Sequence, residues 1–239
     1  MDRNTTSQPR ISVIIPVYNE EIIINETIAT VRRLDENIEI VVADGGLGHT
    51  TLSAIKDQQT IKVESPPGRG RQMNAGAAVA NGDIFLFLHA DTVLPDRAFP
   101  AIAETIGRGI EAGAFRLSID SSRLSLAVIS WFANLRSSWE RVPYGDQAQF
   151  ILADRFRAMG GFADIPIMED VELFKRIRME GLPITILQDT VKTSPRRWKR
   201  EGPLRRTLTN WWLRIQYAFG VSPVRLANHY RPHKDDTEK

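Results

Sequence analysis

Residues 11–43, ISVIIPVYNEEIIINETIATVRRLDENIEIVVA, carry the pattern that decides the fold. The segments Ile11–Val17 and Ile38–Ala43 are short, rich in β-branched residues and apolar on both faces, which is typical of strands buried inside a parallel sheet. Residues 20–34 between them place apolar side chains at helical spacing on one face: Ile24, Ile28, Val31 and Leu34. This order predicts a strand–helix–strand unit.

The same alternation continues along the N-terminal half. We expect helices over residues 51–58 and 72–80 and strands over residues 61–64 and 84–88. Strands that alternate with helices predict an α/β fold, with a Rossmann-like, mostly parallel sheet flanked by helices on both faces.

Three of the expected strands end in polar residues: YNE at 18–20, DGG at 44–46 and HAD at 89–91. Ligands of open α/β sheets bind at the carboxyl ends of the strands, where loops and helix N-termini gather. The sequence therefore predicts one binding crevice at this edge of the sheet.

The C-terminal half is less regular. The expected elements are helices over 100–108, 124–135, 154–159, 169–180 and 204–219, and strands over 114–119, within 145–152 and over 183–187. The helix over 169–180 has two acids in its first turn and Gly181 just past its end, which are ordinary start and stop residues.

The composition narrows the class of protein. A chain of 239 residues with 42% hydrophobic residues is long enough to bury a stable core without disulfides or a structural metal. Since the chain has no cysteine, it can have no disulfide, no cysteine-bound zinc and no thiol nucleophile. The first ten residues lack a secretion signal and no apolar stretch is long enough for a membrane helix, so we expect a soluble, cytoplasmic protein. The net charge of +2 is too small to imply a nucleic-acid partner.

Charge is concentrated near the C-terminus. Residues 194–214 contain seven Lys or Arg residues and one acid, interleaved with aromatic residues. Three interpretations stay open for this segment: arginines that face a diphosphate, a peripheral membrane face for a lipid-linked acceptor at the inner face of the membrane, and an ordinary packing helix with a solvated basic side.

Four short motifs occur in a fixed order: PVYNE at 16–20, ADGG at 43–46, HAD at 89–91 and MEDVEL at 168–173. Together they resemble the family 2 glycosyltransferases, inverting enzymes with a GT-A fold, over about residues 11–188. The FLHADT motif at 87–92 and the SPRRW segment at 194–198 are most similar to small bacterial members.

The resemblance implies one continuous domain with two halves. Residues 11–98 would bind the nucleotide-sugar, and residues 99–232 would bind the acceptor and include the basic, aromatic C-terminal helix. Residues 1–10 are expected to be flexible and residues 233–239 disordered.

The resemblance also implies how the donor is held. Pro16, Tyr18 and Glu20 belong to the loop that holds the nucleoside, with Tyr18 against the uracil ring of a UDP-sugar. Asp44 matches the aspartate that accepts a hydrogen bond from the uracil N–H, although an ordinary turn aspartate is the alternative. Leu47-Gly48-His49 departs from the small polar residues and Asp that usually follow.

A diphosphate needs cations and closely approaching backbone amides, and the segment PGRGR at 67–71 offers both. Arg69 and Arg71 are therefore candidate diphosphate ligands, the alternative being solvated arginines on a flexible connection. Arg197 matches a position of the family that closes over the donor.

The exit of the strand over 84–88 is the candidate metal site. The family usually has Asp-x-Asp here, which holds Mn²⁺ or Mg²⁺ against the diphosphate, and in this chain the first acid is replaced by His89. Imidazole suits Mn²⁺ better than Mg²⁺, so Asp91 and His89 predict a site that favours manganese. In the alternative, His89 contacts the ribose or diphosphate and Asp91 alone binds the metal.

Glu169 and Asp170 match the catalytic Glu-Asp pair of the family. By resemblance Asp170 is the base that takes the proton of the acceptor hydroxyl, and helix capping is the alternative role for the pair. Asp146 and Gly161 lie in segments that shape the acceptor side, where generic turns are the alternative.

The leading hypothesis is a metal-dependent inverting glycosyltransferase that moves a sugar from a UDP-sugar to an acceptor hydroxyl on a sugar, a lipid-linked or a small-molecule acceptor. Two other classes stay open: a sugar nucleotidyltransferase, which should carry a Gly-rich basic loop directly after the first strand, and a non-catalytic sugar-nucleotide-binding protein. The oligomeric state cannot be inferred from the sequence.

Overall fold

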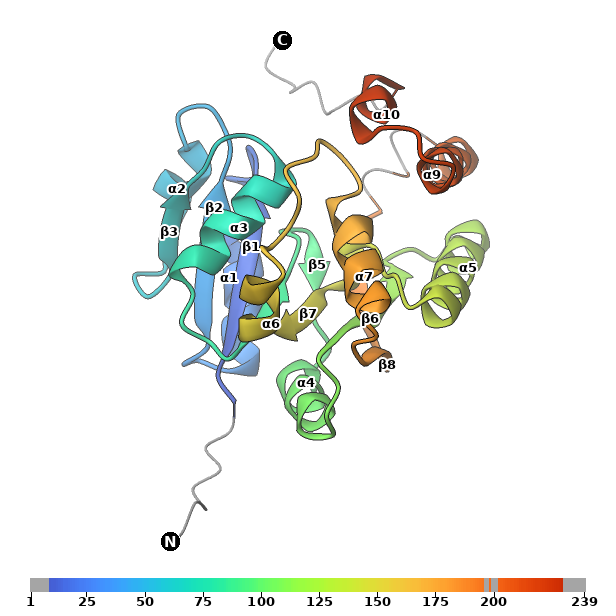
Figure 1. The fold of residues 1–239 in the computed structure, drawn as a ribbon. Coiled ribbons are helices and arrows are strands. Elements are labelled where there is room, and N and C mark those ends of the chain that lie inside the picture. Colours follow the sequence, from blue (N-terminus) through green and yellow to red (C-terminus); the bar gives the residue numbers. More distant parts are fainter. Residues whose placement is uncertain (1–8, 196–197, 199–201, 230–239) are drawn as a thin grey trace, which may run out of the picture.

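The computed structural model describes residues 9–195, 198 and 202–229 (Figure 1). Predictions for most of the N-terminal segment 1–10, for Arg197 and for the tail 233–239 lie outside the described residues.

One sheet of eight strands runs through both predicted halves, in the order β3-β2-β1-β4-β7-β6-β8-β5. The first four strands of this order are parallel: β3 (Ile61–Glu64), β2 (Glu39–Asp44), β1 (Ile11–Val17) and β4 (Ile84–Phe87). Since they are parallel, their carboxyl ends lie at one edge of the sheet, as the sequence predicts.

The other half of the sheet is mixed. Strand β7 (Gln149–Leu152) is antiparallel to β4 and to β6 (Ala112–Ile119). Strand β8 (Ile184–Thr193) is parallel to β6, and the two-residue β5 (Thr92–Val93) pairs antiparallel with its end.

Helices cover both faces of the sheet (Figure 1). Helices α1 (Ile24–Leu34), α2 (Thr50–Ala54) and α4 (Ala98–Gly107) contribute to one apolar cluster. Helices α3 (Arg69–Val79), α6 (Ala153–Ala158) and α7 (Glu169–Met179) contribute to the cluster on the opposite face. Gly76 allows α3 to lie close to the sheet, because a Cβ there would be 2.6 Å from Cγ2 of Ile14.

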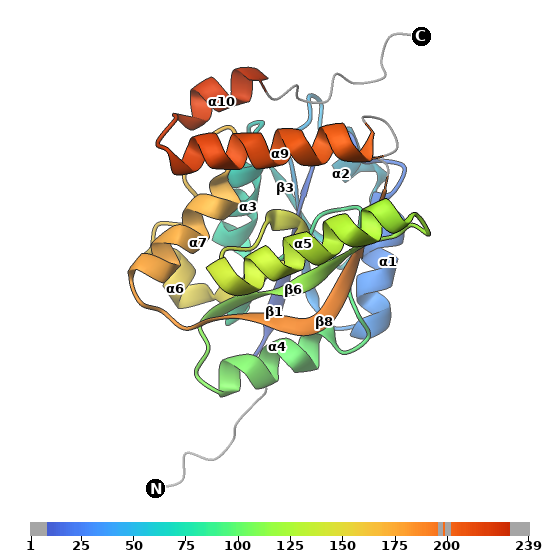
Figure 2. The same cartoon turned by 90° about the vertical axis from the view of Figure 1, so that its right-hand side faces the viewer.

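Two further helices lie side by side on the outside of the mixed half of the sheet (Figure 2). Helix α5 (Leu124–Glu140) packs on β6, where Asn134 exchanges two hydrogen bonds with the backbone of Leu117. Helix α9 (Pro203–Ala218) lies along α5, and α10 (Pro223–His229) follows it. None of the described helices is both long and apolar enough to cross a membrane.

The elements follow the predicted order, with several differences in extent. The helix predicted over 51–58 ends at Ala54 because the Asn25 side chain donates to the Ala54 carbonyl and accepts from the Lys56 N–H, both at 2.9 Å. The strand predicted over 183–187 continues to Thr193 because its polar second part pairs with β6 beyond a bulge. The helix predicted over 124–135 continues to Glu140, and β5 and α10 were not predicted.

Gln72 connects α3 by hydrogen bonds to the edge of the sheet at which β1 and β2 end. Its buried side-chain amide donates to the Val17 carbonyl at the end of β1 and, at 3.2 Å, to the Ala43 carbonyl near the end of β2. A Cβ on Gly45 would lie 2.9 Å from Cδ of Gln72, so the loop after β2 packs directly on this amide.

Replacing Gln72 by Ala should lower the free energy of unfolding by about 1–3 kcal/mol, because both hydrogen bonds are lost from a buried position. Urea denaturation of the two proteins measures this difference. The exposed Gln58 is the matched control, and Gln58→Ala should change stability by less than about 0.5 kcal/mol. Equal effects of the two substitutions would show that Gln72 does not fasten the edge.

Candidate active site

The sheet register brings the polar strand ends together. In the β1–β2 ladder Val17 lies beside Asp44, and in the β1–β4 ladder Ile14 lies beside Phe87, after which the Leu88 N–H donates to the Ile14 carbonyl. The loops that begin at Tyr18, Gly45 and His89 therefore leave neighbouring strands at the same edge.

Asp44 is fully buried at the end of β2. Its Oδ1 accepts a hydrogen bond of 2.7 Å from the Gly46 N–H, and its carbonyl accepts one of 2.9 Å from the Ser65 N–H after β3. Its Oδ2 is buried too, and it has no hydrogen-bond partner within the part of the chain that the structure describes. Most buried carboxylate oxygens are hydrogen-bonded, so Oδ2 is an acceptor suited to a ligand N–H.

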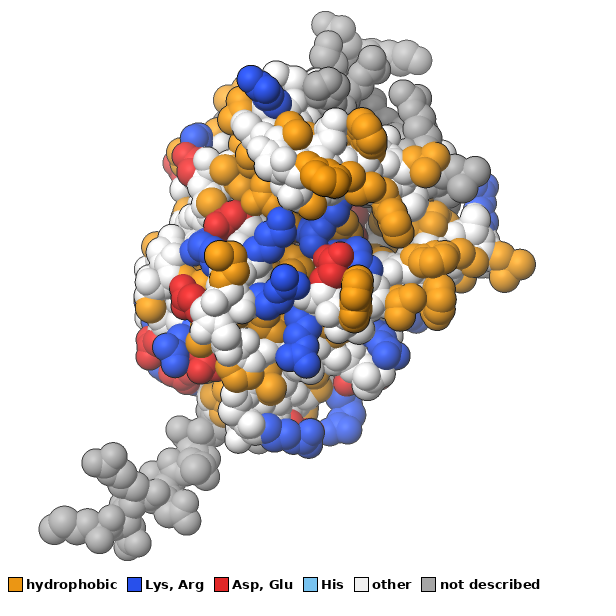
Figure 3. All heavy atoms as spheres, turned by 45° about the vertical axis from the view of Figure 1, so that its right-hand side comes forward, with side chains coloured by type: hydrophobic (Ala, Val, Ile, Leu, Met, Phe, Trp, Pro, Cys, Tyr) orange, Lys and Arg blue, Asp and Glu red, His pale blue; other side chains and the backbone are white. Residues whose placement is uncertain are grey.

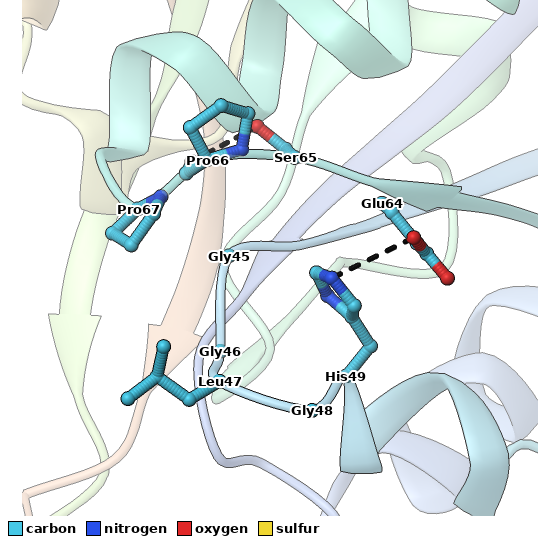
Figure 4. Close-up of a pocket in the computed structure, with 9 residues that line it drawn as sticks. All are labelled: Gly45, Gly46, Leu47, Gly48, His49, Glu64, Ser65, Pro66 and Pro67. Carbon is cyan, nitrogen blue, oxygen red and sulfur yellow. Dashed lines mark hydrogen bonds and ion pairs between the residues drawn. The ribbon is translucent and has the colours of Figure 1, made fainter.

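A pocket of about 380 Å³ lies next to Asp44, between residues 45–49 after β2 and residues 64–67 after β3 (Figure 4). His49 faces Glu64 across it, with 3.7 Å between Nε2 and Oε2. The segment Leu47-Gly48-His49, which departs from the family pattern, thus forms one wall. The volume lies within the range of small-molecule sites.

The loop after β1 contacts the loop after β2. Asn19 has a φ of 54°, and a Cβ on Gly46 would lie 2.9 Å from its Oδ1, so a larger residue at position 46 would collide with it. Tyr18 is 40% exposed, which leaves much of its ring available to a ligand. Pro16 is half-buried within β1, and the Glu20 N–H donates to Oγ1 of Thr51 at 3.1 Å.

Both candidate diphosphate arginines are held by acids from the second half of the chain. Arg69 forms an ion pair with Glu169, the first residue of α7. Arg71 binds Asp164 through two hydrogen bonds of 2.6 and 2.9 Å. Arg69 is thus held by a buried carboxylate, whereas Arg71 and Asp164 form an ion pair that is exposed to solvent, at 50% and 66% of their side chains. Both interpretations of Arg71 stay open.

The two acids at the start of α7 are buried and point to different partners. Glu169 is 1% exposed and faces Arg69. Burial raises the pKa of Glu169, although the guanidinium of Arg69 acts in the opposite direction. Asp170 is 5% exposed, and its Oδ2 accepts a hydrogen bond of 2.6 Å from the Gly145 N–H while its Oδ1 accepts one of 2.7 Å from the Val171 N–H.

His89 and Asp170 meet at Gly145. A Cβ on this glycine would lie 3.0 Å from Nε2 of His89 and 3.3 Å from Oδ2 of Asp170. Two predicted site residues that are 81 positions apart in the sequence therefore flank one backbone position. Asp146 is the next residue of the same 3-10 turn and is half-buried.

Asp91 is half-buried beyond β4, and its carbonyl accepts a hydrogen bond of 3.1 Å from the Ser194 N–H. The segment that leads to Arg197 therefore starts beside Asp91. Among the described residues no three His, Cys, Asp or Glu side chains form a metal-binding group. One carboxylate is enough for a cation that is shared with substrate phosphates, so Asp91 fits a metal held jointly with a diphosphate rather than a closed protein site.

Gly161 has a packing role. Its φ is 73°, and a Cβ there would lie 2.5 Å from Oδ1 of Asn74. Asn74 in turn exchanges two hydrogen bonds with the backbone of Phe162. Gly161 therefore lets α3 hold the loop before α7, and its acceptor role stays a prediction.

Three residues of the site were missed from the sequence: Gln72, Asn74 and Tyr144. Gln72 and Asn74 follow the arginines on α3, and nothing in the sequence distinguishes them from exposed polar residues of a helix. Tyr144 precedes Gly145 and is clamped by Arg136, whose Cζ lies 3.9 Å from the ring centroid. Burial raises the pKa of Tyr144.

The sequence pattern of glycosyl transferase family 2 matches residues 12–163. The chain is 25% identical over 224 residues to the probable glycosyltransferase YdaM of Bacillus subtilis, a match that covers 82% of this chain and 53% of YdaM. It is 27% identical over 120 residues to the undecaprenyl-phosphate 4-deoxy-4-formamido-L-arabinose transferase of Aeromonas hydrophila, covering 45% of this chain and 37% of that protein. The chain thus spans about half of the first relative and less of the second.

Solved structures show the same fold. The mannosyltransferase PcManGT of Pyrobaculum calidifontis, in complex with GDP-Man and Mn²⁺, superposes with a TM-score of 0.63 at 23% identity, covering 78% of this chain and 57% of that one. Glucosyl-3-phosphoglycerate synthase of Mycobacterium tuberculosis, in complex with Mn²⁺, UDP and glucosyl-3-phosphoglycerate, superposes with a TM-score of 0.57 at 19% identity. This match covers 77% of this chain and 71% of that one.

The fold and the family follow from these matches. The architecture is a GT-A fold, an α/β sheet flanked by helices, as the sequence predicts. The family pattern matches more than half of the chain, and the protein belongs to glycosyl transferase family 2. The resemblance drawn from the four motifs is confirmed.

The raised pKa of Glu169 makes stability depend on pH. The folded state binds the Glu169 proton more tightly than the unfolded state, so this contribution to stability is fully present below the ordinary glutamate pKa of about 4.3 and is lost as the pH rises through the higher folded pKa. Glu169→Gln mimics the protonated form. Urea denaturation at pH 4.5 and pH 8 should show that the variant gains stability relative to the wild type at the higher pH, and a difference that does not change with pH would contradict the assignment.

Proposed function

We propose that this protein is an inverting glycosyltransferase that moves a sugar from a UDP-sugar to an acceptor hydroxyl with the help of a divalent metal. The observation that carries the proposal is the meeting of His89 and Asp170 at Gly145. This contact places the Asp170 carboxylate, which would act on the acceptor, close to the exit of β4, where members of the family hold the donor diphosphate. An inverting transfer needs these two parts within reach of one anomeric carbon.

The donor would bind across the ends of β1 and β2. The exposed ring of Tyr18 offers a flat surface for a nucleobase, and the buried Oδ2 of Asp44 offers an acceptor for a base N–H. The two structural neighbours are complexes with GDP-Man and with UDP, so the choice of uracil rests on the resemblance of the motifs.

The diphosphate would lie beside Arg69 and the exit of β4. Arg69 keeps 36% of its side chain exposed while it pairs with the buried Glu169, so its charge is fixed in place and still accessible. We assign Asp91 as the metal ligand, with His89 beside it. A divalent cation bound there would neutralise negative charge on the departing nucleoside diphosphate.

Asp170 is the proposed base. Its carboxylate is oriented by the Gly145 and Val171 N–H groups, with Oδ2 directed toward the His89 side. It would accept the proton of the acceptor hydroxyl while the acceptor oxygen bonds to the anomeric carbon. On the opposite face of the sugar the bond from that carbon to the diphosphate oxygen breaks, which inverts the anomeric configuration.

The acceptor would approach from the 3-10 turn Gly145–Gln147, where Asp146 is a candidate hydrogen-bond partner for a sugar hydroxyl. The second relative is named for a transferase of undecaprenyl-phosphate, which keeps a lipid-linked acceptor among the candidates, next to sugars and small molecules.

A thermal-shift panel of UDP, GDP, ADP and CDP, each with and without Mn²⁺, tests the donor assignment. A ligand at 100 times its Kd adds about 2.7 kcal/mol to the free energy of unfolding, which in a domain of this size raises the Tm by roughly 5–10 °C. We expect the largest shift with UDP and Mn²⁺. Asp91→Ala should remove the part that depends on Mn²⁺, and Asp44→Asn should reduce the whole shift.

The control for this panel is Asp154→Asn, which changes an almost fully exposed carboxylate on α6 and should leave every shift unchanged. A shift by UDP that is the same in EDTA would refute the metal site. A panel with no preferred nucleotide would refute the nucleoside assignment.

Asp170→Asn should keep the nucleotide shift and reduce sugar transfer by at least about 10²-fold, because the amide cannot accept the hydroxyl proton. Transfer from radiolabelled UDP-sugars to a set of sugar and lipid-linked acceptors measures the loss. A variant that still transfers at the wild-type rate would exclude Asp170 as the base. A wild type that binds UDP but neither transfers nor hydrolyses any donor would instead be the non-catalytic binding protein.

A further inference from the structure

Helices α5 and α9 expose an apolar surface that the proposed transfer reaction does not use. We call it the aromatic face. On α5 it consists of Leu124, Val128, Trp131, Phe132, Leu135 and Trp139. On α9 it consists of Leu208, Trp211, Trp212, Ile215 and Phe219. Each of these side chains is between 45% and 85% exposed. Figure 3 shows a broad group of hydrophobic side chains at the upper right, on the side of the molecule where α5 and α9 lie in Figure 1.

The larger polar side chains of α5 are turned inward, and among its polar residues only Ser125 and Ser138 are exposed. The Oγ of Ser130 is hydrogen-bonded to the Ile119 N–H at 3.2 Å, and Asn134 binds the backbone of Leu117. Arg136, the one charged residue between Leu124 and Trp139, has 13% of its side chain exposed and pairs with Glu140. Toward the protein α5 presents these polar groups together with the apolar Leu126, Ile129 and Ala133. Its large exposed side chains are all apolar, which is unusual for a surface helix.

Helix α9 is similar over the side chains that the structure describes, with Leu213 buried on its inner side. Its charged residue there, Arg214, is 12% exposed and binds Glu140 of α5. The two arginines thus converge on one glutamate between the helices, while four tryptophans face outward. The remaining tryptophan of the chain, Trp198, is 8% exposed.

Exposure of the apolar side chains of the aromatic face to water is unfavourable in free energy. Contiguous exposed apolar patches of this kind mark surfaces that bind other proteins or membranes. Tryptophan is enriched at the boundary between lipid and water, where its ring lies among the acyl chains and its N–H reaches the headgroups. A face that presents four tryptophans and no described charge matches the apolar side of an interfacial helix.

The charges at the edge of the face favour anionic lipids. Arg123 and Arg141 flank α5 and are exposed, and Arg178 is exposed beside its C-terminal end, where it donates to the Glu140 carbonyl. Three described acids lie close in sequence to these elements: Asp120 and Glu180 are exposed, and Glu140 is paired with two arginines. Basic residues near the surface of an anionic bilayer contribute about 1 kcal/mol each to binding.

We propose that the aromatic face docks this protein on the surface of an anionic phospholipid bilayer. Helices α5 and α9 lie in the interface, with the tryptophans in the headgroup region and Arg123 and Arg141 against lipid phosphates. The proposal concerns binding alone and does not depend on the sugar-transfer assignment.

Docking in this way places the candidate acceptor side next to the lipid. Residues 141–144 join the end of α5 directly to Gly145, which binds Asp170. Arg136 and Arg214 both lie over the ring of Tyr144, at 3.9 and 5.7 Å from its centroid. The face and the proposed base are therefore connected by one short stretch of packed side chains.

Flotation of the full chain with vesicles tests the proposal. The vesicles contain phosphatidylcholine with 30% phosphatidylglycerol, and pure phosphatidylcholine vesicles serve for comparison. We expect the wild type to float with the anionic vesicles and its tryptophan emission to shift to shorter wavelength. The double variant Leu124→Ser/Trp139→Ser should need at least about tenfold more lipid for half-maximal binding, because it removes the two most exposed side chains of α5.

Two further variants sharpen the test. Ile22→Ser/Leu47→Ser makes the same kind of change at positions that are 95% and 84% exposed on the other half of the molecule, and it should bind like the wild type. Arg123→Glu/Arg141→Glu should weaken binding to the anionic vesicles and leave binding to neutral vesicles unchanged. Circular dichroism and the Tm of each variant confirm that it is folded, which is expected because the changed side chains are exposed.

Two results would overturn the proposal. One is a folded wild type that stays with the aqueous phase at every lipid concentration. The other is light scattering that shows a dimer which Leu124→Ser/Trp139→Ser dissociates, without vesicle binding, since the face would then bind a second copy of the chain.

Discussion

The paired acids at the start of α7 are the constraint on which the rest of the site depends. Glu169 and Asp170 are both buried, and a buried carboxylate is costly unless charge or hydrogen bonds compensate it. Glu169 is compensated by Arg69 at the start of α3, and Asp170 by the Gly145 N–H at the end of the loop after α5. Two adjacent residues thus hold one segment from each half of the chain, and neither segment can move away without leaving a buried carboxylate that lacks its partner.

The strand order of the mixed sheet explains why the partners of Glu169 and Asp170 lie at this edge of the sheet. The parallel strands β1, β2 and β4 deliver three loops to one edge, and the antiparallel β7 then returns the chain from that edge. Gly145 lies just before β7, so the turn that supplies its N–H is held by the β4–β7 ladder, which ends at Phe87, two residues before His89. The meeting of His89, Gly145 and Asp170 is thereby a consequence of strand pairing rather than of local loop structure.

The N-terminal half was predictable because its pattern is local. Buried strands and an amphipathic helix are visible within 30 residues, and the polar strand ends follow from them. The second half of β8 was not predictable, because its polar residues pair with β6 about 74 positions earlier and carry no apolar pattern of their own. The motifs name Asp170 and His89 as candidate site residues, yet their common contact with Gly145 depends on tertiary packing. Gln72 and Asn74 were missed for the same reason, since a buried amide on a helix has no sequence pattern apart from its partners.

The arrangement of polar and apolar side chains on α5 and α9 bears on how the C-terminal half is held together. In most surface helices an apolar stripe binds the core, whereas here the contacts between α5, α9 and the site run through Glu140, Arg136, Arg214 and the ring of Tyr144. Such charged and cation–π contacts are directional, so they orient Tyr144, and with it Gly145, more tightly than an apolar contact of the same area would. Apart from Leu126 and Leu213, these contacts use few of the large apolar residues of the two helices, so most of them stay exposed and available to an external partner. The stabilisation of the site and the exposure of the aromatic face are therefore two results of one arrangement of side chains.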